Sequence, residues 1–301
     1  MTTPASPPAP VTVGVDESDE ALGAVAWAAR YADAANTGLR LVHAIAPVEW
    51  MFGAAVAFSP EGLGAKLSQH ADEVLARATT TAREAAPGLS VQTQVLDGGA
   101  VAEALAQAAA DSLLLVIAAG SAGGGLREAM LGGHVTRTVL SSPVPVVVWR
   151  APEATRTGPP LPVAVGVDES EPAERAVRAA FAAAAVLRAP VQVAHMWETG
   201  AAVGLGYGEG PTDWPLEHVL KAEQEQQITA LVAPVATDFP HVHQVEVRTD
   251  TTPIKGLTEV SGSAQLLVVG SRGRGRLAGA VLGSVSQALL HHARCPLLVV
   301  H

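Results

Sequence analysis

The sequence is poor in cysteine, aromatic residues and basic residues, and two of these shortages exclude a class of protein. The single cysteine, Cys295, allows neither an internal disulfide nor a cluster of thiolate metal ligands, so nothing favours an oxidising compartment. Asp and Glu outnumber Lys and Arg by 29 to 19. This balance argues against a general nucleic-acid-binding protein, because phosphate contacts along nucleic acid need clustered basic residues.

Long apolar runs are also missing. Hydrophobic residues make up 49% of the chain, yet no run reaches the roughly 18 residues that indicate a membrane span. Residues 1–10 lack the basic start and apolar core of a signal peptide and are interpreted as a flexible tail. We therefore expect a cytoplasmic protein that does not bind membranes.

The sequence does contain an internal duplication. Residues 13–18, VGVDES, recur as residues 165–170, and the similar segments 41–44 and 193–196 are separated by the same 152 residues. A repeat of this length indicates two similar domains rather than the short units of a solenoid. We place the first domain at 11–150, a Pro- and Gly-rich linker at 151–160 and the second domain at 161–301.

Each half alternates predicted strands with predicted helices. In the first half the strands are expected at 11–15, 39–45, 90–96, 113–118 and 144–149, and the helices at 20–35, 62–85, 100–111 and 134–140. This alternation predicts an α/β fold in which helices cover both faces of a parallel sheet. Ligands of such sheets bind beyond the carboxyl ends of the strands, where the strand order reverses.

Glycine-rich turns follow the fourth predicted strand of each half. Gly120 and Gly123 are followed by Gly133, as Gly270 and Gly273 are followed by Gly283. Glycine lets the backbone approach a ligand closely, and the N–H groups of such a turn, together with the start of a helix, favour an anion. The turns therefore predict two phosphate sites, although a flexible turn without function remains the alternative.

Polar residues near the second turn support a phosphate site. Arg272, Arg274 and Arg276 can contact one small anion, and the hydroxyls of Ser284 and Ser286 can bind phosphate, cap the next helix, or do both.

Asp16 and Asp168 end the first predicted strand of their halves. A carboxylate at this position can accept hydrogen bonds from ribose hydroxyls. Each aspartate also precedes a predicted helix, so it can equally be a turn or N-cap residue. Because the aspartate occurs in both halves, we favour the ligand.

The combination of these motifs resembles the universal stress protein family, in its tandem, ATP-binding form. The resemblance rests on the strand-end VGVD, the later Gly-x2-Gly-x9-Gly-Ser and the closing CPLLVV, and it covers about residues 10–149 and 162–301. It implies two open five-stranded sheets of order 3-2-1-4-5, each of which binds ATP, with or without Mg²⁺. Such a protein is expected to act as a nucleotide-dependent regulator of the stress response.

The resemblance also implies which residues contact the adenine nucleotide. In the second half Asp168 lies by the adenosine, the backbone of Met196 contacts adenine, and the glycines and Ser284 hold the ribose and phosphates. The complete expected set is Gly14, Asp16, Ala44, Gly120, Gly123, Gly133, His134, Val135 and Thr136 in the first half, and Gly166, Asp168, Met196, Gly270, Arg272, Gly273, Arg276, Gly283, Ser284, Val285 and Ser286 in the second.

His134 departs from this pattern, since it replaces the serine or threonine of the motif. An imidazole still donates one hydrogen bond and favours a polyphosphate when protonated. The first glycine turn also has fewer arginines than the second. We therefore expect the first site to bind ATP more weakly.

Three other functions have weaker support. A P-loop ATPase is disfavoured because no lysine stands in a Gly-x4-Gly-Lys-Ser/Thr motif, although slow ATP hydrolysis stays open. Adenylyl transfer lacks its histidine-rich signature. A dinucleotide-binding protein lacks Gly-x-Gly-x-x-Gly after the first strand.

The closing strands, at 144–149 and 297–300, are apolar, and they would be costly to leave open at sheet edges. Their mutual pairing would make the chain an internal pseudo-dimer, and two chains can associate further into a homodimer.

Overall fold

The computed structural model of the protein describes residues 8–45, 60–97, 99–120, 126–151, 159–168, 170, 172–197, 214–273 and 281–301. The chain divides into two compact units, Met1–Ala151 and Pro152–His301. No helix in these ranges is long and apolar enough to cross a membrane.

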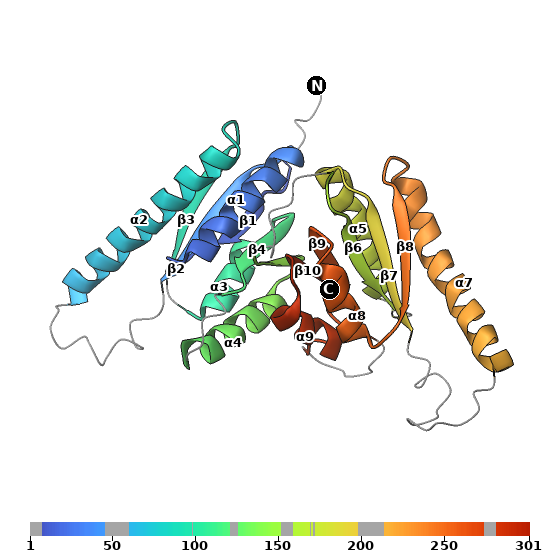
Figure 1. Cartoon of the computed structure of the whole chain (residues 1–301). Helices are drawn as coiled ribbons and strands as arrows, with labels where there is room; N and C mark the ends of the chain where they lie inside the picture. Colours follow the sequence, from blue (N-terminus) through green and yellow to red (C-terminus); the bar gives the residue numbers. More distant parts are fainter. Residues whose placement is uncertain are drawn as a thin grey trace. The chain divides into compact units, whose positions relative to one another are not determined.

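The first unit is a parallel sheet with helices on both faces (Figure 1). Its strands lie in the order β3-β2-β1-β4-β5. Helices α1 and α2 pack together on one face, and α3 and α4 pack together on the other. The elements are β1 (Val11–Gly14), α1 (Asp19–Ala34), β2 (Leu39–Ile45), α2 (Pro60–Ala85), β3 (Val91–Asp97), α3 (Val101–Ala108), β4 (Leu114–Ala118), α4 (Leu126–Ser141) and β5 (Val146–Trp149).

The second unit repeats this arrangement, with strand order β8-β7-β6-β9-β10 and all pairs parallel. Helix α5 packs against α7, and α8 packs against α9. Both units therefore confirm the predicted order 3-2-1-4-5. The elements are β6 (Val163–Val167), α5 (Pro172–Leu187), β7 (Val191–Trp197), α7 (Trp214–Asp238), β8 (Gln244–Asp250), α8 (Pro253–Ser261), β9 (Leu266–Gly270), α9 (Ser284–His292) and β10 (Leu297–Val300).

The central strands are almost wholly apolar because helices cover both of their faces. Val11 and Val13 of β1 are completely buried, as are Val163 and Val165 of β6. Helix α1 presents alanines such as Ala24 to the sheet, and these small residues let the helix approach closely. The core of each unit thus lies between its sheet and the apolar faces of its helices.

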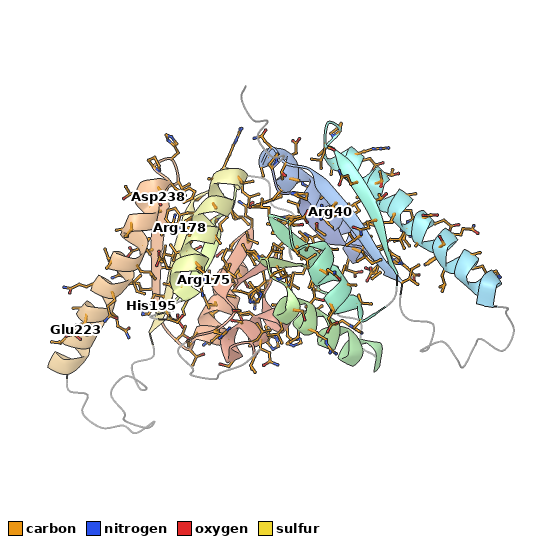
Figure 2. All side chains as sticks on the ribbon, turned by 180° about the vertical axis from the view of Figure 1, so that it is seen from behind. Arg40, Arg175, Arg178, His195, Glu223 and Asp238 are labelled. Carbon is orange, nitrogen blue, oxygen red and sulfur yellow. The ribbon has the colours of Figure 1, made fainter. Side chains whose placement is uncertain are left out.

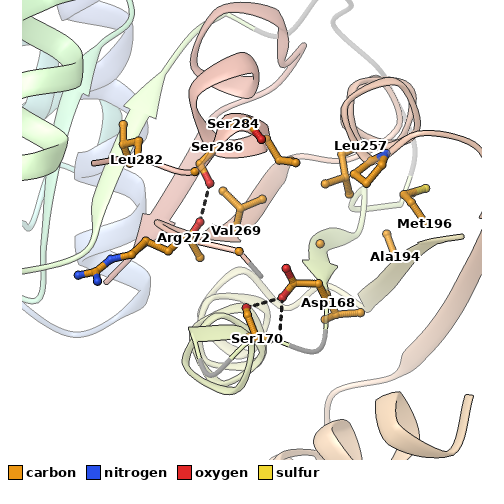
Figure 3. Close-up of a pocket in the computed structure, with 18 of the residues that line it drawn as sticks. Asp168, Ser170, Ala194, Met196, Leu257, Val269, Arg272, Leu282, Ser284 and Ser286 are labelled. Carbon is orange, nitrogen blue, oxygen red and sulfur yellow. Dashed lines mark hydrogen bonds between the residues drawn. The ribbon is translucent and has the colours of Figure 1, made fainter. Parts of the chain in front are cut away.

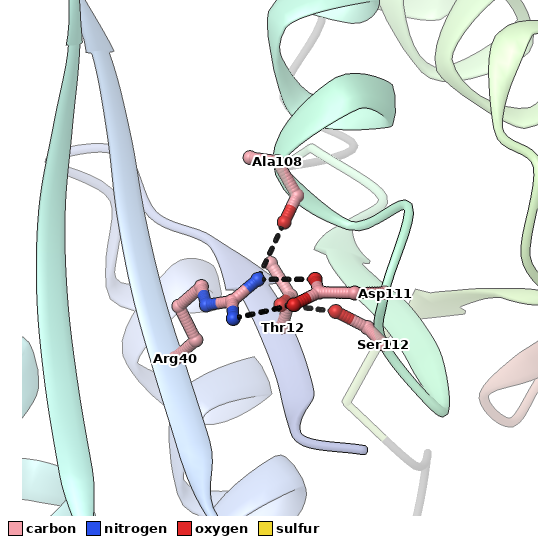
Figure 4. Close-up of polar contacts among 5 residues, drawn as sticks. All are labelled: Thr12, Arg40, Ala108, Asp111 and Ser112. Carbon is pink, nitrogen blue, oxygen red and sulfur yellow. Dashed lines mark hydrogen bonds and ion pairs between the residues drawn. The ribbon is translucent and has the colours of Figure 1, made fainter.

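A polar cluster lies near the amino ends of β1 and β2 in the first sheet (Figure 4). Arg40 of β2 donates to both carboxylate oxygens of Asp111, at 2.6 and 3.0 Å, and to the Ala108 carbonyl at the end of α3, at 2.8 Å. The hydrogen bond from Arg40 holds the pKa of Asp111 below its usual value. Thr12 and Ser112 join their buried hydroxyls at 2.8 Å beside this pair. The cluster fixes the end of α3 against β1 and β2.

Strand β4 ends at Ala118 as predicted, two residues before Gly120. One helix boundary in the first unit differs clearly from the prediction. Helix α4 begins at Leu126 rather than near His134. The residues 126–131 are Leu, Arg, Glu, Ala, Met and Leu, all of which favour helix, so the helix forms earlier in the chain than the glycines suggested.

Candidate functional site

A cavity of about 420 Å³ opens in the second unit at the carboxyl ends of β6, β7 and β9 (Figure 3). Strands β6 and β9 are neighbours at the point where the strand order reverses, which is the usual ligand position in an open α/β sheet. The first turns of α5, α8 and α9 complete the wall. Ten of the predicted residues line it: Gly166, Asp168, Met196, Gly270, Arg272, Gly273, Gly283, Ser284, Val285 and Ser286.

Asp168 follows β6 and projects its carboxylate into the cavity. Its Oδ1 accepts a hydrogen bond from the Ser170 backbone N–H at 3.0 Å and another from the Ser170 hydroxyl. Its Oδ2 has no hydrogen-bond partner among the residues that the structure describes, and it lies 3.0 Å from the position that a Cβ on Gly273 would occupy. One oxygen therefore holds the turn into α5, and the other is available to a ligand.

The first turn of α9 supplies the donors of the site. Its N-cap is Gly283, which offers no side-chain oxygen. The first helical hydrogen bond runs from the Gln287 N–H to the Gly283 carbonyl, at 2.8 Å. The N–H groups of Ser284, Val285 and Ser286 precede that bond, and no partner for them lies within the described ranges. These three donors, together with the partial positive charge of the helix start, suit an anion.

Backbone and side-chain hydrogen bonds hold this turn in place. The Gly283 N–H donates to the Ser271 carbonyl at 2.8 Å, and the buried Ser286 hydroxyl donates to the Gly270 carbonyl at 2.7 Å. The one proton of the Ser286 hydroxyl is therefore already used. Ser286 thus stabilises the turn, while the exposed Ser284 hydroxyl makes no hydrogen bond with the described residues, and binding of phosphate by these hydroxyls stays a prediction.

Two glycines of the site are required by packing. A Cβ on Gly166 would lie 2.8 Å from a methyl carbon of Leu257, so this glycine lets α8 pack on β6. A Cβ on Gly283 would lie 3.3 Å from the backbone nitrogen of Gly273, so this glycine lets the two backbone segments meet. Gly166 thus lines the cavity, but it is the packing of α8 that favours glycine at this position.

Apart from Met196, the apolar wall of the cavity was not predicted from the sequence. Ala194 and Met196 of β7 face Leu257 of α8, and Val269 of β9 lies nearby (Figure 3). Pro253, Val281 and Leu282 add further apolar surface. The repeat contained a clue, since Leu105 contacts Gly14 in the first unit as Leu257 contacts Gly166 in the second. A leucine that recurs opposite a recurring strand glycine indicates a wall of the same crevice.

Arg272 lines the cavity, but its guanidinium points away from Asp168 (Figure 3). Arg276 and Arg274 lie outside the described residues, as does Gly123 of the first unit. The predicted arginine trio is therefore represented by one member.

In the first unit Asp16 repeats the turn of Asp168. Its Oδ1 accepts the Ser18 N–H at 2.9 Å, and the Ser18 hydroxyl in turn accepts the Ala21 N–H at 3.1 Å. Ser18, rather than the aspartate, is thus the N-cap of α1. Gly14 and Ala44 lie on β1 and β2 as predicted for this edge of the sheet.

Strand register shows that Gly120 is not the counterpart of Gly270. Ala118 pairs with Trp149 of β5 as Gly270 pairs with Val300 of β10. The next N–H in each unit, of Ala119 and of Ser271, donates to the Trp149 or Val300 carbonyl. Gly120 therefore lies two residues farther from its strand than Gly270 does, and it adopts a left-handed conformation with φ of 81°.

The second part of the predicted first site lies inside a helix. Gly133, His134, Val135 and Thr136 belong to α4, which begins at Leu126, so their N–H groups take part in helical hydrogen bonds. His134 is exposed on this helix. The second unit brings its predicted residues together, whereas the first unit does not present these N–H groups to an anion.

An open parallel sheet with helices on both faces and a crevice at its strand-order switch defines a doubly wound α/β protein. Comparison with known proteins is more specific. The model of the universal stress protein family matches residues 9–150 and again residues 161–301, and the chain therefore belongs to this family.

Individual relatives match this chain over nearly the whole length of both proteins. A universal stress protein of Mycobacterium tuberculosis is 31% identical over 297 residues, which cover 96% of this chain and 95% of that protein. One from Mycolicibacterium smegmatis is 32% identical over 298 residues, which cover 96% of each. The crystal structure of a universal stress protein from Archaeoglobus fulgidus has a TM-score of 0.64 at 18% identity, covers 97% of this chain and 96% of that one, and supports the fold.

Proposed function

We propose that the cavity of the second unit binds an adenine nucleotide, ATP, and that the protein acts as a nucleotide-dependent regulator in the cytoplasm. The observation that carries this proposal is the meeting of two features in one cavity. The N–H groups at the start of α9 and Oδ2 of Asp168, none of which has a hydrogen-bond partner among the described residues, belong to residues that line the same cavity.

The start of α9 suits the phosphates. Ser284, Val285 and Ser286 offer adjacent backbone donors, and the Ser284 hydroxyl adds a fourth. Because Gly283 has no side chain, nothing from the N-cap residue competes with a ligand for these donors. The helix dipole adds attraction for negative charge.

The opposite wall suits the adenosine. Ala194, Met196 and Leu257 give an apolar surface on which a flat base can lie. Asp168 lines the same cavity, where Oδ2 can accept hydrogen bonds from ribose hydroxyls. The base, ribose and phosphates of a nucleotide can thus be matched by the apolar, acidic and N–H-rich parts of this surface.

Binding with little or no hydrolysis fits the residues of the cavity best. Asp168 is the only carboxylate among its described lining residues, and one of its oxygens is held by Ser170. No lysine lines the cavity within the described ranges. Any Mg²⁺ would therefore be carried mainly by the phosphates, and occupancy rather than turnover would be the regulatory signal.

Calorimetric titration of the full chain with ATP tests the proposal. We expect one well-defined binding event, and about tenfold weaker binding in Asp168→Asn, because a charged acceptor for the ribose is lost. Asp16→Asn is the matched variant: retained affinity assigns the site to the second unit, and an equal loss would place nucleotide in the first unit as well. Absence of measurable binding of adenine nucleotides to the wild-type chain would refute the proposal. Rapid release of phosphate from ATP would instead favour an ATPase.

A further inference from the structure

His195 is a buried polar residue beside the cavity that the proposed function leaves without a role. It lies on β7, one residue before Met196, and is 7% exposed. Its Nδ1 lies 3.1 Å from the Val167 carbonyl oxygen at the end of β6. A carbonyl oxygen can only accept a hydrogen bond, so Nδ1 carries the proton and donates.

The other ring nitrogen connects the strand to a helix. Nε2 of His195 lies 3.1 Å from the amide oxygen, Oε1, of Gln224 on α7, and Figure 2 shows His195 beside that helix. A neutral imidazole accepts at Nε2, and an imidazolium donates there. A glutamine amide serves either form by a half-turn, because its NH₂ donates and its oxygen accepts. The bridge from Val167 to α7 therefore persists in both charge states.

The carbonyl that His195 holds belongs to the peptide between Val167 and Asp168. Fixing this peptide plane fixes the position of the Asp168 Cα and the axis of its N–Cα bond, which leaves rotation about that bond as the freedom that must still be restricted. Ser170 holds the Asp168 carboxylate from the other side through Oδ1. Asp168 is thus held by His195 through the preceding carbonyl and by Ser170 through Oδ1, with Oδ2 turned toward the cavity.

The first unit repeats the hydrogen bond from a histidine Nδ1 to the carbonyl that precedes the strand-end aspartate. His43 of β2 donates from Nδ1 to the Val15 carbonyl at 2.8 Å, directly before Asp16. Its other neighbour differs, because the ring of His70 lies edge-on to it at a centroid distance of 6.4 Å. The histidine bond to the strand-end carbonyl is common to both units, whereas the second contact is not.

We propose that His195 is a positioning residue of the nucleotide site, which acts by holding the Val167 carbonyl so that Oδ2 of Asp168 faces the ligand. The inference rests on the proposed function for its consequence, but its geometric content does not depend on any nucleotide.

Asparagine and glutamine at position 195 provide a matched pair of variants. Both are neutral amides, but the asparagine nitrogen stands where Nδ1 stands and the glutamine nitrogen reaches toward the place of Nε2. We expect His195→Asn to keep ATP affinity within about threefold, and His195→Gln and His195→Leu to lose about tenfold, since only asparagine restores the bond to Val167. Equal losses in Asn and Gln variants of similar unfolding midpoint would overturn the proposal.

A double variant tests whether His195 acts through Asp168. In Asp168→Asn, the further change His195→Leu should weaken ATP binding less than twofold, because the aimed carboxylate is already gone. A further tenfold loss would show that His195 acts independently and would contradict the proposal.

Hydrogen exchange without nucleotide separates this inference from the proposed function. The Ser170 N–H is protected by Asp168 Oδ1, and we expect its exchange to be several-fold faster in His195→Leu and His195→Gln but unchanged in His195→Asn. Unchanged exchange in all three variants would refute the positioning role even if ATP binds. Failure of the wild type to bind ATP, with this exchange pattern intact, would refute the proposed function alone.

Discussion

The ends of β4 and β9 carry the same glycine pattern but form different structures. After β9 the chain reaches Gly273 and later begins α9 at Ser284, where three N–H groups have no partner among the residues that the structure describes. After β4 the first glycine of the pattern lies two residues beyond the place of Gly270, and α4 begins at Leu126. The two units therefore have the same strand order, but the backbone after the fourth strand differs between them.

The difference teaches that motif spacing alone does not establish structural equivalence. Gly120 and Gly270 match by sequence, but hydrogen-bond register aligns Gly270 with Ala118. A strand-end glycine can bind phosphate only if the following backbone lies over the sheet edge. In the first unit a helix-forming segment precedes Gly133. The N–H groups of Gly133 and the three residues after it therefore form hydrogen bonds within α4.

The largest expected effect is the loss of nucleotide in Gly273→Glu. A glutamate here would place its Cβ 3.0 Å from Asp168 Oδ2 and would bring its carboxylate into the space proposed for phosphate. Juxtaposed like charges cost several kcal/mol, so ATP affinity should fall more than about hundredfold. Calorimetry measures the loss.

Gly273→Ala is the control for this variant, since it adds the Cβ without the charge, and it should weaken binding far less. Gly273 is exposed, so the unfolding midpoint of both variants should stay close to that of the wild type. Stoichiometric ATP in Gly273→Glu would contradict the assignment of the site to the second unit.

High pH should separate the stabilities of the two units. Burial raises the pKa of Tyr31, on α1, from 10.0 to about 12, whereas the second unit has Ala183 at the corresponding place of α5. Because the folded pKa is raised, the unfolded state loses its proton first. The stabilisation is complete below pH 10 and is lost as the pH rises toward about 12, by about 3 kcal/mol.

Alkaline titration in a Tyr207→Phe background checks this expectation, because Tyr31 is then the one tyrosine that titrates. Phenolate absorbance should rise together with loss of helical circular dichroism from one unit. In the additional variant Tyr31→Phe, that unit should survive to higher pH. Ionisation near pH 10 without unfolding would show that Tyr31 is accessible in the folded state.

The fold could be predicted from sequence because the elements that define it are strongly patterned. Strands such as β1 and β6 are short apolar runs at the same place in each repeat, and alternation with helices requires parallel pairing. The family resemblance supplied the strand order, which alternation alone leaves open. The largest difference in the first unit is the start of α4, at Leu126 rather than near His134.

The site was predictable where residue type and chain position coincide, as at Asp168 and Gly273. Side-chain hydrogen bonding was not, because the Ser286 hydroxyl can donate to phosphate or to the Gly270 carbonyl, and only the geometry decides. The partners of Leu257 and His195 could not be predicted for a similar reason. Each contacts a residue distant in sequence, Gly166 or Val167, and only the fold brings the two together.

Alanine at Gly133 and at Gly283 should have opposite effects on the two units. Gly133 lies within α4, where alanine is favoured over glycine by about 1 kcal/mol, so the helix should become more stable. Gly283 is the N-cap of α9, where alanine is a poor residue and its Cβ would lie 3.3 Å from the Gly273 nitrogen. This change should destabilise the turn by about 1 kcal/mol and weaken ATP binding.

Hydrogen exchange of peptides from α4 and α9 measures both effects in the intact chain. Gly133→Ala should slow exchange in α4 and leave α9 and ATP affinity unchanged, while Gly283→Ala should speed exchange at the start of α9. If Gly133→Ala instead lowers the number of ATP molecules bound, the first unit also uses its glycine as a helix start when nucleotide is present. The two units would then differ in the stability of one helical segment rather than in the capacity to form a site.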